Sequence, residues 1–486
     1  MFRKTTDIKS IIHATGLFPL PLGERVRVRG NLVKCNKYSC FCAQWSTIWQ
    51  SHRIHKTGFF KLTLVILAFL FLSCAEKPVY REEVFYPKIK RPAVIVKLLE
   101  TENSLTISSK ESFSIRCFPS EGEPSIYYAS GKIDVKFFDE GIVLNQNTQG
   151  MLEGNLCKVS FLPKKENSCL YLNDKPYRGI LEITLGKNPE SLLALNIIHL
   201  EDYLQGVVPA EMGKLSHPEL EALKAQAITA RTYALFRMGQ KSKLESSGAE
   251  REYDLEATVA DQVYSGVSVE DPLVNRAIQL TQGKVLTYQG KLVCAYYHAN
   301  CGGMTEYIEK VWDKPPEPYL IPIDDNEFCS WAKNYRWEES WTKDVLQKNI
   351  KEFLDSNQNS YDEKLRDADA SFDLLDLKIK ERALSGRVEL LEVVTDKGAY
   401  PLRSDKIRWA LKRANNHNYI LPSTCFDLEI KRGDDNSIQR VTARGRGNGH
   451  GVGMCQTGAI GMAKAGYSYK NILMHYYPGI KITKCY

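Results

Sequence analysis

The feature that most constrains the fold is an alanine-rich segment, PELEALKAQAITARTYALFRM, at residues 218–238. It contains no glycine or proline after Pro218. Ser216 followed by Glu219 forms a capping-box pattern, which predicts where a helix begins. Apolar residues recur at spacings of three and four and form one stripe, which consists of Leu220, Leu223, Ala227, Ala230 and Ala234. We therefore predict a long helix whose small side chains allow a neighbouring element to pack closely.

The other segments predict strands and two further helices. Between residues 105 and 200, SLTISS, FSIRCF, KIDVKFF, LCKVSFL and ILEITL are short and partly alternating, as expected for an antiparallel sheet. Near the carboxyl end, CQTGAIGMAKAG and YKNILMHYY are helical. We expect an α+β fold with mixed β-sheets, the long alanine-rich helix and these carboxyl-terminal helices. Residues 335–400 look like an insertion of one helix and further strands.

The positive charge of the chain lies at its amino end. The net charge is +7, but residues 1–74 contain eleven lysines and arginines against two acidic residues, so the remainder is slightly acidic. A basic surface for phosphate backbones is therefore missing from the main part of the chain. We expect no nucleic-acid partner.

An apolar run, LTLVILAFLFL, occupies residues 62–72 and follows Lys56 and Lys61. It is shorter than the roughly 20 residues that span a bilayer, and it suits the apolar region of a signal peptide at 56–74. The sequence FLSC that ends at Cys74 is similar to a bacterial lipobox, so we expect Cys74 to be lipidated. An ordinary secretory signal cut nearby, or a short anchor, is the alternative. We expect an exported protein anchored in the cell envelope, periplasmic or extracytoplasmic.

Residues 1–55 are basic and have neither helical nor strand periodicity. No methionine lies between Met1 and Met151, and we interpret 1–55 as an upstream extension that does not fold. A zinc knuckle is the alternative, although its spacing fits a tetrahedral pattern poorly; it would use Cys35, Cys40 and Cys42 with His52 or His55. Residues 75–104 are expected to be a tether with a strand at its end, and 105–169 a β-rich unit.

One acidic side chain stands in an apolar setting. Glu211, in GVVPAEM, is the one acidic residue between Asp202 and Glu219. A carboxyl group with apolar neighbours is harder to ionise, so its pKa rises. A general acid needs such a pKa near neutral pH. The alternative is a solvated glutamate in a loop before a helix.

A glycine pair follows a histidine and a cysteine in YYHANCGGMTE, residues 296–306. His298, Cys301 and the later Cys329 could form a metal site. We favour a glycine turn with a Cys301–Cys329 disulfide and a hydrogen-bonded His298. A catalytic Cys301 is disfavoured, because no electropositive helix end is evident to lower its thiol pKa.

A second glycine-rich segment, GRGNGHGVGMCQTGA, spans residues 445–459 and has five glycines in its first nine positions. Such density indicates backbone freedom or close approach to another group. The segment lacks the Lys-Ser/Thr of a P-loop and the features of a dinucleotide site. His450 would be accessible in so open a loop, and Gln456 begins the next helix. A turn that only packs tightly is the alternative.

Together these segments resemble the stage II sporulation protein D family, also called amidase-enhancer proteins. The resemblance covers about residues 170–483, which we take as the catalytic domain, and it rests on several motifs in order. They are YRGILEI, LEDYLQGVVPAEM, LKAQAITARTYAL, YYHANCGGMTE and RGNGHGVGMCQTGAIGMAKAGYSYKNILMHYYPG.

The resemblance implies a peptidoglycan lytic transglycosylase, which cuts the MurNAc–GlcNAc bond of glycan strands stripped of peptides. Its catalytic acid and base would be Glu211. A glycosidase commonly uses two carboxylates, whereas here the C6 hydroxyl of the sugar attacks and forms a 1,6-anhydro ring. The process served would be wall remodelling, division or sporulation.

The resemblance also implies residues that bind substrate around a glycan cleft. The candidates are Gln226, Arg231, Tyr233, His298, Gly302, Gly303, Glu306, Gly449, His450 and Gln456. Arg231 is rotated away from Gln226 on the helix, so some of these side chains must be structural. No cofactor is required. Some members bind zinc near the glycine pair, and His298 and Cys301 are the candidate ligands here, although the spacing assembles no four-ligand set. Cys301 and Cys455 stand where many relatives have serine.

Two other functions compete with the transglycosylase. The first is a non-catalytic glycan-binding enhancer of a separate N-acetylmuramoyl-L-alanine amidase. The second is an amidase in its own right, which is disfavoured because the chain has no HxxEH-type pair for zinc. The expected partners are peptidoglycan strands, the membrane through a lipid anchor, and a cell-wall amidase.

Overall fold

The computed structural model describes residues 92–486, apart from 147–149, 189, 247–251, 358–371 and 417. The amino-terminal extension, the signal peptide, Cys74 and most of the tether lie outside the described residues. Within the described part, no helix is both long enough and apolar enough to cross a membrane.

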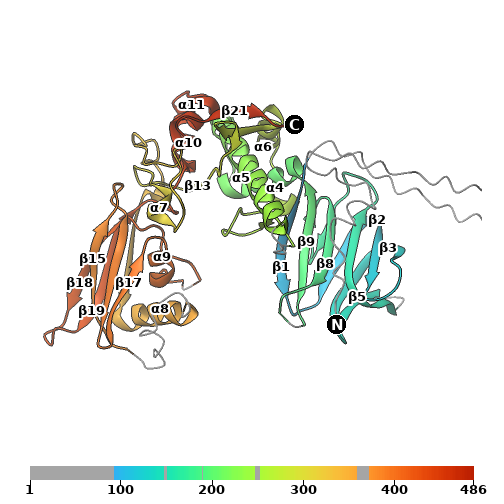
Figure 1. Ribbon diagram of the computed structural model, residues 1–486, viewed down its shortest axis with the longest axis horizontal. Coiled ribbons are helices and arrows are strands. Elements are labelled where there is room, and N and C mark those ends of the chain that lie inside the picture. Colours follow the sequence, from blue (N-terminus) through green and yellow to red (C-terminus); the bar gives the residue numbers. More distant parts are fainter. Residues whose placement is uncertain (1–91, 147–149, 189, 247–251, 358–371, 417) are drawn as a thin grey trace, which may run out of the picture. The chain divides into compact units, whose positions relative to one another are not determined.

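The amino-terminal part forms one sheet of ten strands, in the order β10-β1-β9-β8-β5-β4-β3-β2-β6-β7 (Figure 1). Its strands are β1 (Ala93–Thr101), β2 (Leu105–Pro119), β3 (Ser125–Phe138), β4 (Gly141–Gln146), β5 (Gly150–Pro163), β6 (Leu170–Leu172), β7 (Lys175–Tyr177), β8 (Ile180–Leu185), β9 (Leu192–His199) and β10 (Leu255–Glu256). Because β5 also pairs with β2, strands β2–β5 close on themselves. The sequence predicted a boundary between two units at residue 170. The sheet is continuous across this position, because β8 pairs with both β5 and β9.

A helical layer packs on this sheet. It consists of α4 (Leu200–Met212), α5 (Leu220–Ser246), α6 (Pro272–Leu280), α10 (Gln456–Lys464) and α11 (Tyr469–Tyr476). The predicted capping box is confirmed, with Ser216 and Glu219 bonded to each other ahead of α5. The prediction of a single apolar stripe on α5 was too narrow. Residues on all sides of the helix are buried, because α4, α6, α10, α11 and a strand surround it.

Short strands bring the two glycine-rich segments together. β11 (Lys284–Tyr288) pairs with β12 (Lys291–Leu292) and with β21 (Lys481–Lys484). β13 (Tyr297–His298) pairs in parallel with β20 (Met454–Cys455). An isolated bridge joins Asn300 to Asn448. The glycine-pair loop, residues 299–306, therefore lies beside the carboxyl-terminal glycine loop, residues 445–453, and α7 (Ile308–Val311) follows the first of them.

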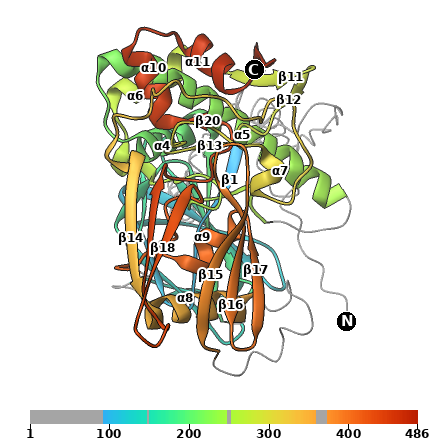
Figure 2. The same ribbon diagram turned by 90° about the vertical axis from the view of Figure 1, so that its left-hand side faces the viewer.

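Residues 336–446 form a group of strands and helices (Figure 2). This group has a hydrophobic core of its own, the second core, which includes Trp341, Leu346, Leu391 and Val441. Its elements are β14 (Arg336–Thr342), α8 (Lys343–Ser356), β15 (Leu374–Arg382), β16 (Val388–Thr395), β17 (Gly398–Arg403), α9 (Lys406–Leu411), β18 (Phe426–Arg432) and β19 (Ile438–Arg446). The core extends beyond residue 400, where the sequence analysis ended the insertion, because β19 pairs with both β14 and β18. The whole described part is an α+β protein.

A buried ion pair ties the helical layer together. Arg231 of α5 donates from Nε and Nη2 to the two carboxylate oxygens of Glu201 of α4, at 2.9 and 2.8 Å. Both residues are buried. The same carboxylate accepts from the backbone N–H of Gly283 and from the hydroxyl of Tyr486. One ion pair thus links α4, α5 and the carboxyl-terminal residue.

Replacing Arg231 with alanine should destabilise the protein by about 3–5 kcal/mol, because Glu201 would remain buried without its cation. Urea unfolding followed by tryptophan fluorescence measures this cost. Arg444→Ala is the matched control, since Arg444 pairs with Glu338 and Glu429 on the surface, and it should leave the unfolding midpoint nearly unchanged. Equal losses in the two variants would contradict the structural role of the buried pair.

Candidate functional site

Glu211 lies in the last turn of α4, and Gly213 ends the helix with a positive φ of 70°. The side chain is half-buried. Its Oε1 accepts hydrogen bonds from the backbone N–H of Val263 at 2.8 Å and from the hydroxyl of Tyr297 at 3.3 Å. Its Oε2 accepts one from Nε2 of Gln456 at 3.4 Å. The carboxyl group is therefore held between a helix end, the start of the glycine-pair loop and the start of α10.

Burial raises the pKa of Glu211, and the three hydrogen bonds act in the opposite direction without cancelling the effect of burial. Among the described residues, no charged side chain contributes to this pKa. The group therefore keeps its proton to higher pH than a solvated glutamate, and it can still return to the ionised form that its donors stabilise. This balance is what a group needs if it is to give and then receive one proton.

Tyr297 is one of the three hydrogen-bond donors to Glu211, and it was not among the residues predicted from the sequence. Its hydroxyl also accepts a hydrogen bond from Nε2 of Gln262 at 3.0 Å, and Oε1 of Gln262 accepts one from Tyr203 at 3.2 Å. Neighbouring residues of a strand point to opposite sides, so Tyr297 and His298 cannot both face Glu211. The alternation limits the choice to one of the two residues, and it does not say which one.

The two candidate histidines bond to backbone groups. Nδ1 of His298 donates to the carbonyl of Val452 at 3.1 Å, and Nε2 of the same ring has no partner among the described residues. Nδ1 of His450 accepts from the N–H of Val452 at 3.1 Å, so its Nε2 donates to the carbonyl of Tyr297 at 2.9 Å. Burial lowers the pKa of His298 and lowers the pKa of His450 to about 3. Both rings are neutral near pH 7 and hold the loops in place.

An aromatic group adjoins this histidine pair. The indole of Trp312 lies 4.7 Å from the ring of His450 and 4.8 Å from that of Tyr296, measured between centroids. The ammonium of Lys314 lies 5.0 Å from the Trp312 ring. Trp312 is half-buried, and the sequence analysis did not select it. Half-exposed aromatic faces are suited to packing against the apolar side of a sugar ring.

The three residues of α5 that were expected to bind substrate lie in the interior. Gln226 and Arg231 are fully buried, and the guanidinium of Arg231 is engaged by Glu201. Tyr233 is also buried, and its hydroxyl donates to Asp261 at 2.8 Å. These side chains lie in the interior because α5 is covered on all sides. Arg231 and Tyr233 are engaged by interior partners, whereas the amide of Gln226 has no hydrogen-bond partner among the described residues.

Glu306 is likewise occupied by the protein itself. It is fully buried. Its Oε2 accepts from the backbone N–H of Ser385 at 3.2 Å and from the hydroxyl of the same residue, and its Oε1 accepts from the N–H of Tyr307 at 2.9 Å. Glu306 therefore attaches the glycine-pair loop to the turn between β15 and β16. The expected sugar contact is replaced by this structural one.

The selected glycines serve the approach of one backbone to another. Gly302 has a φ of 76°, and a Cβ there would lie 3.0 Å from the backbone of Arg446. Gly449 has a φ of 109°, and a Cβ there would lie 2.8 Å from the Cβ of His298. Gly303, with a φ of 107°, faces the hydroxyl of Tyr335. The geometry supports the alternative in which these glycines allow tight packing, in place of direct contact with a sugar.

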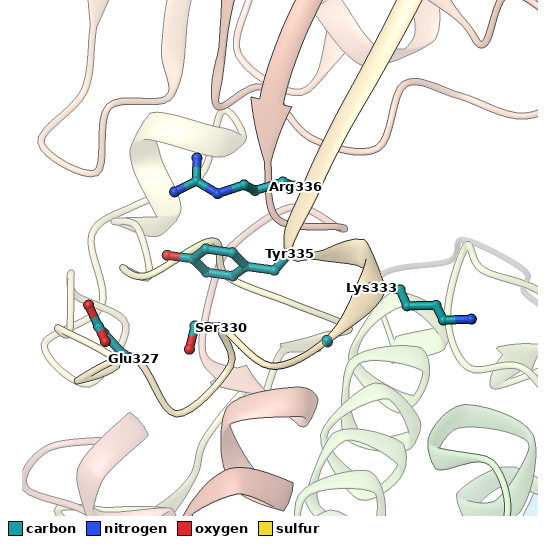
Figure 3. Close-up of a pocket in the computed structure, with 6 residues that line it drawn as sticks. Glu327, Ser330, Lys333, Tyr335 and Arg336 are labelled. Atoms are coloured by element: carbon teal, nitrogen blue, oxygen red, sulfur yellow. The ribbon is translucent and has the colours of Figure 1, made fainter.

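A polar pocket lies at the start of the second core (Figure 3). It is lined by Glu327, Ser330, Ala332, Lys333, Tyr335 and Arg336. Glu211 is not among its lining residues, so this pocket and the carboxyl site are separate. The segment that forms it also carries Cys329.

Four potential metal ligands gather behind the glycine-pair loop, namely Cys301, Asp325, Cys329 and Cys455, and all are buried. The predicted disulfide is not formed, since Sγ of Cys301 lies 3.5 Å from Sγ of Cys329 and both are free thiols. His298 is outside this cluster. Among the described residues, the set that could hold a metal therefore differs from the one that the sequence analysis considered.

The fold and the site together define an α+β protein in which one half-buried carboxyl group sits between a helix end and two paired glycine-rich loops. A family model described as Stage II sporulation protein matches residues 188–288. A second model, described as a domain of unknown function, matches residues 326–453, a range that contains the second core.

The chain is also similar to three proteins over more than half of its length. Stage II sporulation protein D of Bacillus subtilis is 30% identical over 301 residues, which are 59% of this chain and 75% of that protein. An uncharacterised protein of Brachyspira hyodysenteriae is 30% identical over 297 residues, 60% of this chain and 69% of the relative. The amidase enhancer of Bacillus subtilis is 29% identical over 356 residues, 68% of this chain but only 47% of its own length. The chain belongs to the stage II sporulation protein D family.

Gly449→Ala should destabilise the protein more than Gly466→Ala in urea unfolding. Gly466 has a φ of 87° with nothing within 4 Å of an added Cβ, so its variant measures backbone strain alone, about 1–2 kcal/mol. Gly449→Ala adds the collision with His298 and should cost about 1–3 kcal/mol more. Equal costs would mean that the two loops do not depend on this close approach.

Proposed function

We propose that this protein is a peptidoglycan lytic transglycosylase in which Glu211 is the single acid and base. One observation carries the proposal: Glu211 is half-buried, its pKa is raised, and its hydrogen-bond partners are neutral donors. An enzyme with one carboxyl group must use that group twice. A neutral environment suits such a group, because a fixed neighbouring charge would hold it in one protonation state.

In the proposed reaction, protonated Glu211 gives its proton to the oxygen between MurNAc and the following GlcNAc, and the bond from that oxygen to C1 breaks. The C6 hydroxyl of the MurNAc attacks C1 and closes a 1,6-anhydro ring. Glu211, now ionised, accepts the hydroxyl proton and returns to its starting form. No water is consumed, and the donors from Val263, Tyr297 and Gln456 stabilise the carboxylate between the two transfers.

The glycan would approach Glu211 along a cleft beside the paired loops. We propose that Trp312 and Tyr296 pack against a sugar ring there, because they share an aromatic cluster with His450, whose Nε2 holds the backbone of Tyr297. Positioning of this kind supplies the part of the rate acceleration that acid–base catalysis does not. The protein would act outside the cytoplasm, exported and held at the membrane by a lipid on Cys74.

A second function is favoured by a specific observation, the similarity to a protein named amidase enhancer in Bacillus subtilis. In that alternative, the chain binds glycan strands without cutting them and stimulates a separate cell-wall amidase. An amidase is also the candidate partner if the chain cuts glycans itself, since the favoured strands have lost their peptides.

Glu211→Gln should lower the cleavage of peptide-free glycan strands by about 10²–10⁴-fold, the usual contribution of a positioned acid–base group. Mass spectrometry detects the products as saccharides with 1,6-anhydro-MurNAc ends. Glu392→Gln is the control, because Glu392 lies on β16 in the second core and its change should leave cleavage intact.

Three results would separate the hypotheses. Anhydro ends at the wild-type level from Glu211→Gln would refute the assignment of Glu211. No anhydro ends from the wild-type protein, together with stimulation of an added amidase, would replace the enzyme with the enhancer. Neither cleavage nor stimulation would refute both.

The pH dependence of kcat/KM for glycan cleavage should depend on the hydrogen bonds to Glu211. The acid form is the active one in the first step, so kcat/KM should fall as the pH rises through the raised pKa. Tyr297→Phe removes a donor to the carboxylate and should raise this pKa further, moving the alkaline limb to higher pH by up to about one unit. Tyr467→Phe, at an exposed tyrosine, should leave the limb unmoved. A shift of the Tyr297→Phe limb to lower pH would contradict the assignment of the limb to Glu211.

A further inference from the structure

Three thiols and one carboxylate converge in the interior, and Glu211 is not one of these groups. The ligand atoms of Cys301, Asp325, Cys329 and Cys455 all lie within 4.8 Å of one another. Each residue is at most 2% exposed. A tetrahedral zinc site with bonds of about 2.3 Å to sulfur places its sulfurs about 3.8 Å apart. The observed separation of 3.5 Å between Sγ of Cys301 and Sγ of Cys329 is close to that value.

The four residues come from three segments that are distant in sequence. Cys301 precedes the glycine pair, Asp325 and Cys329 lie four positions apart in the loop before the second core, and Cys455 is the N-cap of α10. Two backbone N–H groups point at the sulfur of Cys455, from Cys301 at 3.2 Å and from Gly458 at 3.3 Å. These two N–H groups hold the sulfur of Cys455 at the start of α10, facing Cys301.

A disulfide explains the cluster less well than a metal does. A bonded pair of sulfurs lies about 2.05 Å apart, and a Cys301–Cys329 bond would leave Cys455 and Asp325 without a role. Packing of apolar groups does not explain the cluster either. The carboxylate of Asp325 is fully buried, and none of the ion pairs among the described residues includes it. Its contacts are a hydrogen bond from the N–H of Cys329 at 2.6 Å and one from the hydroxyl of Tyr476. A buried carboxylate surrounded by thiols calls for a cation.

We infer that Cys301, Asp325, Cys329 and Cys455 bind one zinc ion as a closed structural site. Three sulfurs and one oxygen suit zinc, whereas magnesium and calcium take oxygen ligands only. Four protein ligands leave no open position for water, so the ion would have no catalytic role. Binding would release the thiol protons to solvent, with no change in oxidation state.

A bound zinc ion would hold three segments of the chain together. The ion would join the glycine-pair loop, the loop of residues 321–330 and the first turn of α10, which also carries the Gln456 that bonds Glu211. The inference does not depend on the proposed function, because zinc binding is measured without any glycan. Failure of the zinc site would leave the assignment of Glu211 intact, and the reverse also holds.

The full-length chain, purified under reducing conditions, should contain about one zinc ion by inductively coupled plasma mass spectrometry. Substitution with cobalt should give the visible d–d bands of tetrahedral Co²⁺ and a sulfur-to-metal charge-transfer band. Cys455→Ser and Asp325→Asn should each weaken binding at least about tenfold, and removing the metal should lower the melting temperature of the wild-type protein. Two variants are used so that failure of one to fold does not remove the test.

Two matched controls keep the test specific. Cys294→Ser replaces a buried thiol outside the cluster, and Cys40→Ser replaces one in the amino-terminal segment; both should retain the zinc and the cobalt spectrum. Loss of metal from Cys40→Ser with full retention in Cys455→Ser would overturn the assignment. A metal-free protein with a Cys301–Cys329 disulfide, detected by peptide mass spectrometry, would overturn it too, as would Co²⁺ bound without charge-transfer bands.

Discussion

The close approach of two glycine-rich backbones is the constraint on which the site depends. A Cβ at Gly449 would collide with His298, and one at Gly302 would press on the backbone of Arg446. Without side chains at these points, β13 and β20 can pair in parallel. That pairing places Tyr297 and Gln456 on either side of the same carboxyl group. The glycines thus influence the carboxyl site indirectly, because the close approach of the two backbones brings hydrogen-bond donors that are far apart in sequence to the same carboxyl group.

Three buried or half-buried carboxyl groups of the protein have different kinds of partner. Glu201 is neutralised by Arg231 in a bidentate pair, and Glu306 is surrounded by hydrogen-bond donors from Ser385 and Tyr307. Glu211 has no cation and is only half-buried, and burial raises its pKa. An unpaired acid at the edge of a well-paired interior loses some of the stabilisation that an ion pair would supply. The same lack of a fixed charge leaves its proton transferable.

Much of the fold could be predicted from local pattern. The capping box at Ser216, the long helix after it and the two carboxyl-terminal helices follow from periodicity and capping chemistry, which act within a few residues. The carboxyl-terminal boundary of the second core could not be predicted from local pattern, because β19 pairs with β14 across about a hundred residues. The burial of Gln226 and Arg231 could not be predicted from local pattern either. Polar residues on an alanine-rich helix look exposed until the neighbouring helices that bury them are in place.

The sequence by itself determined that Glu211 stands among apolar neighbours, that two glycine-rich segments exist, and that the chain mixes helices with strands. Only the tertiary structure decided which groups contact that carboxyl, and Tyr297, which had not been predicted, is one of them. It also decided that Cys301 meets Cys455 and Asp325. The physical reason is range: propensity, capping and hydrophobic periodicity act between near neighbours. Hydrogen bonds and ligand clusters depend instead on separations of a few ångströms between segments that the chain alone does not bring together.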